Sequence, residues 1–263
     1  MKRILYFRRD LRVDDNLLFS FGGEVLPIFI FDTNILNKLK SDDKRIDFIF
    51  DAVIKLKSDL QKIGLDLKIF YGEPIEIFSY LVSFEFDEVM ACGDYDSYAK
   101  ERDRAISHIL HFRYLHDTYI FKPNDVLKKD GTPYLVFTPF YKQALEVLKT
   151  KNLEISHAKH TLYKTNYDGI NILKNNTLIS TTLDIKNIGF NPPKQEFTPA
   201  KIKLHAIKEK LNNYTKNRDY PSLNASSNLA IDLRFGTIGV REIIRTIKDI
   251  EGGDAFFKTV DIS

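Results

Sequence analysis

Residues 25–31 read VLPIFIF, and this almost continuously apolar stretch decides the fold. Such a stretch is typical of a parallel strand that is covered on both faces. Four further short runs are strand candidates, at residues 4–7, 65–70, 88–92 and 114–119. The first part of the chain therefore predicts a sheet built from several short strands.

The segments between these strands have the periodicity of helices. Apolar residues recur at spacings of three and four until Gly64 ends the pattern, at Ile46, Ile49, Val53, Leu56, Leu60 and Ile63. Pro74 suits the first turn of a second helix, and residues 98–111 predict a third. Strands that alternate with helices imply right-handed crossovers, so we expect an α/β fold with a doubly wound, Rossmann-like parallel sheet. Ligands of such sheets bind beyond the carboxyl ends of the strands.

The rest of the chain has a different pattern. Residues 150–200 are polar and weakly periodic, and turn-forming stretches interrupt them at 175–177 (NNT), 191–193 (NPP) and 198–199 (TP). From about residue 200 the pattern is helical. We therefore expect an α/β domain over residues 1–130, a surface-packed interdomain connector over 131–200, and the beginning of an all-helical domain over 201–263.

Composition narrows the classes of function. The single cysteine, Cys92, excludes an internal disulfide and a cysteine-rich metal site, and we expect it to be a buried structural thiol. The histidine pairs 108/111 and 157/160 lack a nearby third ligand, so no metal site is predicted. No apolar stretch is long enough to span a bilayer, and the N-terminal residues lack the features of a signal peptide. We expect a cytoplasmic monomer without membrane contact.

The loop after the first predicted strand is rich in charge. Residues 8–16 read RRDLRVDDN, with three arginines and three aspartates. They can form an interlocked polar network at the carboxyl edge of the sheet or a solvated loop, and the charge pattern by itself favours the solvated loop. The chain has no Gly-x-Gly-x-x-Gly motif and no phosphate-binding P-loop, so a dinucleotide site of the usual type is unsupported.

A second candidate region begins at residue 201. Its basic side chains suit backbone phosphates, although a solvated helix face is the alternative: Lys201, Lys203, Lys208, Lys210, Lys216 and Arg218. A helical run then starts near Leu229 and includes Leu233 and Ile238. Ser226 or Ser227 can cap this helix, or the serine hydroxyls and the free N–H groups of a helix start can hold a pyrophosphate. Spacing alone leaves both interpretations open.

Several motifs, in order along the chain, resemble those of the DNA photolyase and cryptochrome family. LYFRRDLRVDDN (5–16) is similar to the family's signature at the first strand, and VLPIFIFD (25–32) is similar to its second strand. GEP (72–74), Tyr95 with ERD (101–103), DGTPY (130–134) and VFTPF (136–140) follow in the family's order. YTKNRDYP (214–221), SSNL (226–229), LRFG (233–236) and Arg241 are similar to the start of the flavin domain. The resemblance covers most of the chain except about 150–200.

The resemblance implies a role for each candidate residue. The phosphates and ribityl chain of FAD would be contacted by Tyr214, Ser226, Ser227, Asn228 and Leu229, and Arg218 would meet a phosphate beside a DNA lesion. In a deoxyribodipyrimidine photo-lyase, reduced FAD absorbs blue light and passes an electron to a cyclobutane pyrimidine dimer flipped out of the duplex. No catalytic residue of the protein itself is nominated. An antenna chromophore, when present, sits against the α/β domain.

Three departures from the family pattern stand beside this resemblance. The chain stops at Ser263, shortly after the flavin domain begins, and has no tryptophan, so we expect it to be too short to repair DNA alone. Residues 230–232 read AID where the family usually has Ser-Pro-Tyr. Ala99 stands where folate-antenna members tend to carry glutamate, which disfavours folate and leaves a deazaflavin, a flavin or no antenna. The alternatives to repair are a cryptochrome-like blue-light sensor and a non-catalytic remnant.

Overall fold

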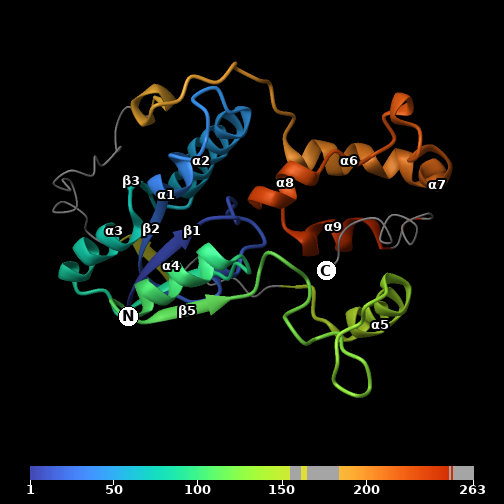
Figure 1. The fold of residues 1–263 in the computed structure, drawn as a ribbon, viewed down its shortest axis with the longest axis horizontal. Coiled ribbons are helices and arrows are strands. Elements are labelled where there is room, and N and C mark those ends of the chain that lie inside the picture. Colours follow the sequence, from blue (N-terminus) through green and yellow to red (C-terminus); the bar gives the residue numbers. More distant parts are fainter. Residues whose placement is uncertain (155–160, 165–183, 249, 251–263) are drawn as a thin grey trace.

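The computed structural model of the chain describes residues 1–154, 161–164, 184–248 and 250 (Figure 1). The strands are β1 (Lys2–Phe7), β2 (Gly23–Asp32), β3 (Lys68–Gly72), β4 (Glu88–Cys92), β5 (Phe112–Leu115) and β6 (Leu162–Lys164). The helices are α1 (Thr33–Leu36), α2 (Lys44–Lys62), α3 (Pro74–Leu81), α4 (Ser97–Ser107), α5 (Phe137–Thr150), α6 (Ala200–Lys210), α7 (Tyr214–Asn217), α8 (Ala230–Phe235) and α9 (Val240–Ile247). Short 3₁₀ segments cover 17–19, 82–84, 185–188, 211–213 and 221–223. The predicted turn at 175–177 and the histidines at 157 and 160 lie outside the described residues.

The sheet is parallel and doubly wound, which confirms the predicted fold. Its strand order is β3-β2-β1-β4-β5, and β6 pairs with the first residues of β2. The chain therefore reverses its winding direction between β1 and β4. At the edge of the sheet where β1, β4 and β5 begin, the buried carboxylate of Glu88 accepts hydrogen bonds from Arg3 Nε at 2.6 Å and Arg113 Nε at 2.8 Å.

Two predicted strands are displaced along the chain, whereas the runs at 4–7 and 25–31 lie inside the slightly longer β1 and β2. β3 begins at Lys68 rather than at 65, because the buried side chains of Leu65 and Leu67 pack into the core before strand pairing starts. β5 spans Phe112–Leu115 rather than 114–119. The chain leaves the sheet after Leu115, and Asp117 then points into a buried cluster of arginines. Apolar character at 65–67 is therefore not enough for strand pairing, and the run at 114–119 includes polar residues that lie outside the sheet.

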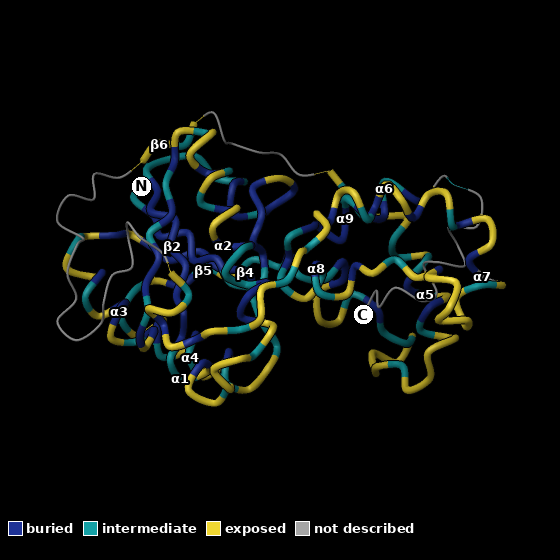
Figure 2. Tube along the Cα trace, turned by 90° about the horizontal axis from the view of Figure 1, so that it is seen from above, coloured by how far each residue is buried: buried dark blue, intermediate teal, exposed yellow. Residues whose placement is uncertain are grey.

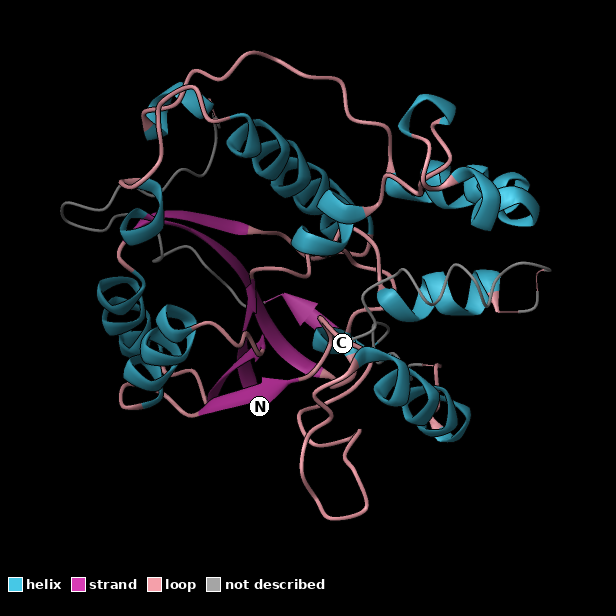
Figure 3. Ribbon diagram, turned by 45° about the vertical axis from the view of Figure 1, so that its right-hand side comes forward, coloured by secondary structure: helices cyan, strands magenta, loops and turns pink. Residues whose placement is uncertain are grey.

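Alternation along β1 explains the layers. Leu5 and Phe7 face the cluster that contains the apolar stripe of α2, whereas Ile4 and Tyr6 face the cluster that contains α3 and α4 residues. Successive side chains of a strand point to opposite faces, so both faces of the sheet are buried. Figure 3 shows the strands between these two layers of helices. Figure 2 shows that most of the sheet is buried, although β5 and β6 contain exposed residues. As expected, α2 ends just before Gly64, which has a φ of +78°, and Pro74 begins α3.

The later helices form a core of their own beside the sheet (Figure 1). This core joins α6 and α9 to α5, which buries Tyr141 and Ala144 although it falls in the segment expected to be a connector. The domain boundaries at 130 and 200 stay a prediction. Among the described helices, none has both the length and the apolar character needed to cross a membrane.

Candidate functional site

The loop after β1 is an interlocked buried network, so its interpretation as a solvated loop was wrong. Arg8 Nη1 donates to both carboxylate oxygens of Asp103, at 2.6 and 2.8 Å. Arg9 reaches Asp94 at 2.8 Å, beyond the end of β4. Asp10 is 1% exposed, and burial raises the pKa of its carboxyl group. The crevice at which the sheet changes winding direction is therefore filled by ion pairs of the protein itself.

The same loop joins the sheet to the helical part. Asp117 accepts short hydrogen bonds from Arg12 and Arg241, and all three side chains are buried. The carbonyl of Asp15 accepts from the same two guanidinium groups, at 2.7 and 2.8 Å. Burial alone would lower the pKa of Arg12, but the charges of Asp117 and other carboxylates raise it. Asp117 was not among the candidate residues, because it lies inside the run at 114–119 that predicted a strand. In the structure β5 ends at Leu115, so Asp117 lies just beyond the carboxyl end of that strand.

The C-terminal end of α8 is packed against this loop. Gly236 has a φ of +66°, and a Cβ atom there would lie 2.0 Å from the carbonyl oxygen of Arg9. Leu11 N donates to Phe235 O at 3.2 Å, and Arg12 Nη1 donates to Gly236 O at 3.2 Å. Only glycine permits this close approach, which sets the position of α8 and of the segment that precedes it.

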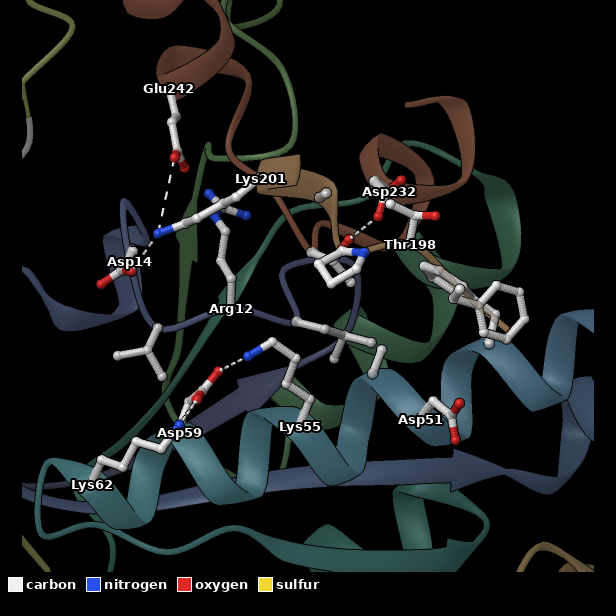
Figure 4. Close-up of a pocket in the computed structure, with 18 of the residues that line it drawn as sticks. Arg12, Asp14, Asp51, Lys55, Asp59, Lys62, Thr198, Lys201, Asp232 and Glu242 are labelled. Carbon is white, nitrogen blue, oxygen red and sulfur yellow. Dashed lines mark hydrogen bonds and ion pairs between the residues drawn. The ribbon is translucent and has the colours of Figure 1, made fainter. Parts of the chain in front are cut away.

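A cavity of about 600 Å³ lies between α2, the loop after β1 and the helical part (Figure 4). Figure 4 shows α2 along one wall, with Asp59 between Lys55 and Lys62, and Lys201 reaching toward Asp14 and Glu242. The apolar lining consists of Leu11, Val13, Phe48, Ala52, Ile63, Phe197, Pro199 and Ala200. Five acidic and four basic side chains line it as well, so its charge is balanced. This lining suits a largely apolar ligand with few charges better than a pyrophosphate.

The structure brings together the two stretches of the predicted cofactor site. Tyr214 starts α7 and is 7% exposed, Leu229 is 1% exposed, and both belong to the same hydrophobic cluster. Between them, Ser226 and Asn228 are exposed, and Ser226 Oγ donates to Asn228 Oδ1 at 3.0 Å. The buried side chains of Tyr214 and Leu229 thus fix the two ends of a segment whose polar side chains are on the surface.

The predicted serine cap of the following helix was wrong. The N-cap residue of α8 is Leu229, which provides no side-chain bond to the helix. Ser227 Oγ instead accepts from Leu229 N at 3.3 Å, one residue before the helix begins. Ile238 lies beyond the end of α8, which has only six residues. The Ser227 hydroxyl therefore stabilises a turn that precedes α8 and does not cap the helix itself.

The basic segment is partly committed to ion pairs and hydrogen bonds within the protein. Lys203 pairs with the buried Asp232 at 2.7 Å, and Lys201 pairs with Asp14 at 2.9 Å. Arg218 is exposed and lies 3.5 Å from Asp219. Of these three cations, Arg218 is the one that most resembles a surface phosphate ligand.

The molecule is a doubly wound α/β protein in which buried ion pairs join the carboxyl edge of the sheet to a group of helices. The DNA photolyase family model matches residues 3–160, and the chain belongs to this family. A deoxyribodipyrimidine photo-lyase of Alkalihalophilus pseudofirmus is 30% identical over 95% of this chain and 54% of that protein. The chain thus spans about half the length of the curated photo-lyases it matches.

Solved structures show the same fold. A class III photolyase from Agrobacterium tumefaciens superposes with a TM-score of 0.76 at 23% identity, over 98% of this chain and 56% of that one. An archaeal photolyase from Sulfolobus tokodaii, described with two FAD molecules, has a TM-score of 0.73 at 24% identity, over 98% of this chain and 57% of that one.

Proposed function

We propose that this chain provides the α/β domain and the first flavin-binding residues of a light-driven flavoprotein that splits cyclobutane pyrimidine dimers in DNA. Membership of the DNA photolyase family supports this activity, as does the similarity to proteins named deoxyribodipyrimidine photo-lyase. Within the structure, the observation that carries the proposal is the meeting of Tyr214 and Leu229 in one cluster, with exposed polar side chains between them.

The residues present fit a phosphate-bearing cofactor in most respects. Ser226, Ser227 and Asn228 offer two hydroxyl groups and one amide on a surface segment that buried neighbours hold. Asp232 would repel an anion, but Lys203 pairs with its carboxylate at 2.7 Å and Thr237 donates to it at 2.8 Å. Its negative charge is therefore largely compensated. Ala230 offers no hydroxyl, so we expect the contacts to concentrate on the three residues before Leu229.

The remaining roles follow from this placement. FAD in its reduced form supplies the electron for dimer splitting when it is bound. Tyr214 and the 226–229 segment would hold its phosphates and ribityl chain, and Arg218, one turn after Tyr214, would contact a DNA phosphate. An antenna chromophore is the proposed occupant of the cavity in Figure 4, whose volume of about 600 Å³ suits a cofactor. Ala99 disfavours folate as its identity.

Flavin binding by the purified full chain tests the proposal. We expect visible flavin absorption to remain with the protein after FAD is added and the excess removed. Replacing both Ser226 and Ser227 by alanine should weaken FAD binding about tenfold, through the loss of roughly 1.4 kcal/mol of hydrogen bonding. Ser83→Ala is the matched control, because its exposed hydroxyl bonds a carbonyl oxygen in a different part of the fold.

The outcomes separate the candidate functions. Equal FAD affinity in the double variant and the control would remove the two serines from the site. Light-dependent loss of pyrimidine dimers would support repair and would contradict the expectation that this chain is too short to repair DNA alone. Flavin binding without that loss is the result we expect of this chain under both the repair and the sensor interpretation. A chain that binds no flavin at all would contradict the flavoprotein proposal and favour the remnant.

A further inference from the structure

A second hollow opens at the carboxyl ends of β4 and β5 and shares no lining residue with the cavity of Figure 4. Its volume is about 390 Å³. It is lined by Tyr95, Tyr119, Phe121, Lys122, Pro123, Asn124, Val126 and Phe140. These residues come from the loop after β4, the loop after β5, and α5, so three separate segments converge on it. Four of the eight lining side chains are aromatic rings.

The rings are ordered but only partly covered. The centroids of Tyr95 and Tyr119 lie 5.5 Å apart at an interplanar angle of 40°. Tyr95 OH lies 3.1 Å from His116 Nδ1, a hydrogen bond that restrains the tyrosine ring. Both tyrosines are half-buried, whereas Phe121, which also lines the hollow, is buried. A flat ligand would therefore meet tyrosine rings that are already oriented.

The charged side chain that lines this hollow is a cation. Lys122 is the charged residue among those that line it, and it is exposed. Nearby Asp125 forms an ion pair with Lys151 and accepts from the backbone N–H of Lys122 at 2.8 Å. Burial lowers the pKa of His116, and Lys122 lowers it further, so both disfavour the protonated imidazole. Among the described residues, none that lines the hollow is acidic, in contrast to the cavity of Figure 4.

We propose that this hollow binds one nucleotide, with its base against the rings of Tyr95 and Tyr119 and its phosphate at Lys122. Aromatic side chains beside a cation are the combination that single-stranded nucleic acid and nucleotides need, because every base has a face that can stack. A volume of about 390 Å³ lies in the lower part of the range for small-ligand sites, which suits a single nucleotide. The nucleotide can be free or part of a single strand. This site is independent of the proposed flavin site.

The test measures binding of thymidine 5′-monophosphate and of an eight-residue oligothymidylate to the full chain by titration calorimetry. Tyr119→Ala should weaken the binding of both by about five- to a hundredfold, because one stacking contact contributes roughly 1–3 kcal/mol. Tyr119→Phe retains the ring and should bind as the wild type does. Lys122→Ala should weaken binding and lower its salt dependence.

Control variants separate this site from other surfaces. Tyr163→Ala removes an exposed tyrosine from β6 and should leave nucleotide binding unchanged. Arg218→Ala should weaken binding of the oligomer at most, and not of the mononucleotide. Binding of both probes supports a site for a free nucleotide, and binding of the oligomer alone, if it depends on Tyr119, supports a site for a strand. Equal affinity of Tyr119→Ala and the wild type would overturn the proposal, as would a lack of binding to either probe.

Discussion

Asp117→Asn probes the joint between the sheet and the helical part. The carboxylate of Asp117 lies between the guanidinium groups of Arg12 and Arg241, and its side chain is fully buried. The substitution keeps the shape of the side chain but removes its charge. It also turns one acceptor oxygen into an amide that faces a donor.

The expected cost follows from this geometry. Breaking a buried ion pair by removing one partner costs about 3–5 kcal/mol, because the other charge stays buried without compensation. Asparagine still accepts one hydrogen bond, and Asp15 still accepts from Arg241 at 2.8 Å and from Arg12 at 2.7 Å. We therefore expect a loss near the lower limit, about 3 kcal/mol in the free energy of unfolding. For a chain of this size that corresponds to a decrease of roughly 6–12 °C in Tm.

Urea unfolding followed by circular dichroism measures this loss. Glu146→Gln is the matched control, because Glu146 is exposed and pairs with Lys149 at 2.7 Å on the surface of α5. Such a surface pair contributes about 0–1 kcal/mol. Arg241→Gln, alone and combined with Asp117→Asn, completes a double-mutant cycle, in which the combined loss should be smaller than the sum by about 1–3 kcal/mol. A loss in Asp117→Asn no greater than in the control, or full additivity, would refute the reasoning.

Three further predictions concern other parts of the chain. Burial alone would raise the pKa of Glu88, but two arginines lower it below its usual 4.5. The stabilisation that Glu88 provides is therefore present above pH 4.5, and it is lost as the pH falls through the lower pKa of the folded state. Urea unfolding of Glu88→Gln should accordingly show a weaker loss of stability at acid pH than the wild type, and parallel pH profiles would contradict this. Gly236→Ala should lower Tm more than Gly64→Ala. Both glycines have a positive φ, but only a Cβ atom at 236 would meet backbone, 2.0 Å from Arg9 O. Equal losses of about 1–2 kcal/mol in the free energy of unfolding would argue against a tight contact. Arg218→Ala should weaken DNA binding and reduce its salt slope by about one without changing flavin content, and an unchanged slope in anisotropy titrations would remove Arg218 from the DNA-binding surface.

Much of the architecture could be read from local patterns. The run at 25–31 predicted a buried parallel strand because helices cover both faces of such a sheet, and β2 is indeed buried there. The apolar stripe before Gly64 predicted α2 because a helix repeats its faces every three to four residues. Local pattern was less informative at residues 114–119, because only Tyr114 and Leu115 of this run pair in β5 and the polar residues that follow lie outside the sheet.

Local patterns and motifs were enough to predict the doubly wound fold and the family, and they nominated the two stretches at 214 and 226–229 as candidates for binding a cofactor. The roles of the charged side chains became clear only in the folded chain. Partners such as Arg8 with Asp103 and Arg241 with Asp15 are separated by 95 and 226 residues, so no local pattern contains them. A charged loop and a buried ion network have the same composition. The difference between them is whether folding removes the groups from water and places opposite charges beside them, and that is a property of the packed chain.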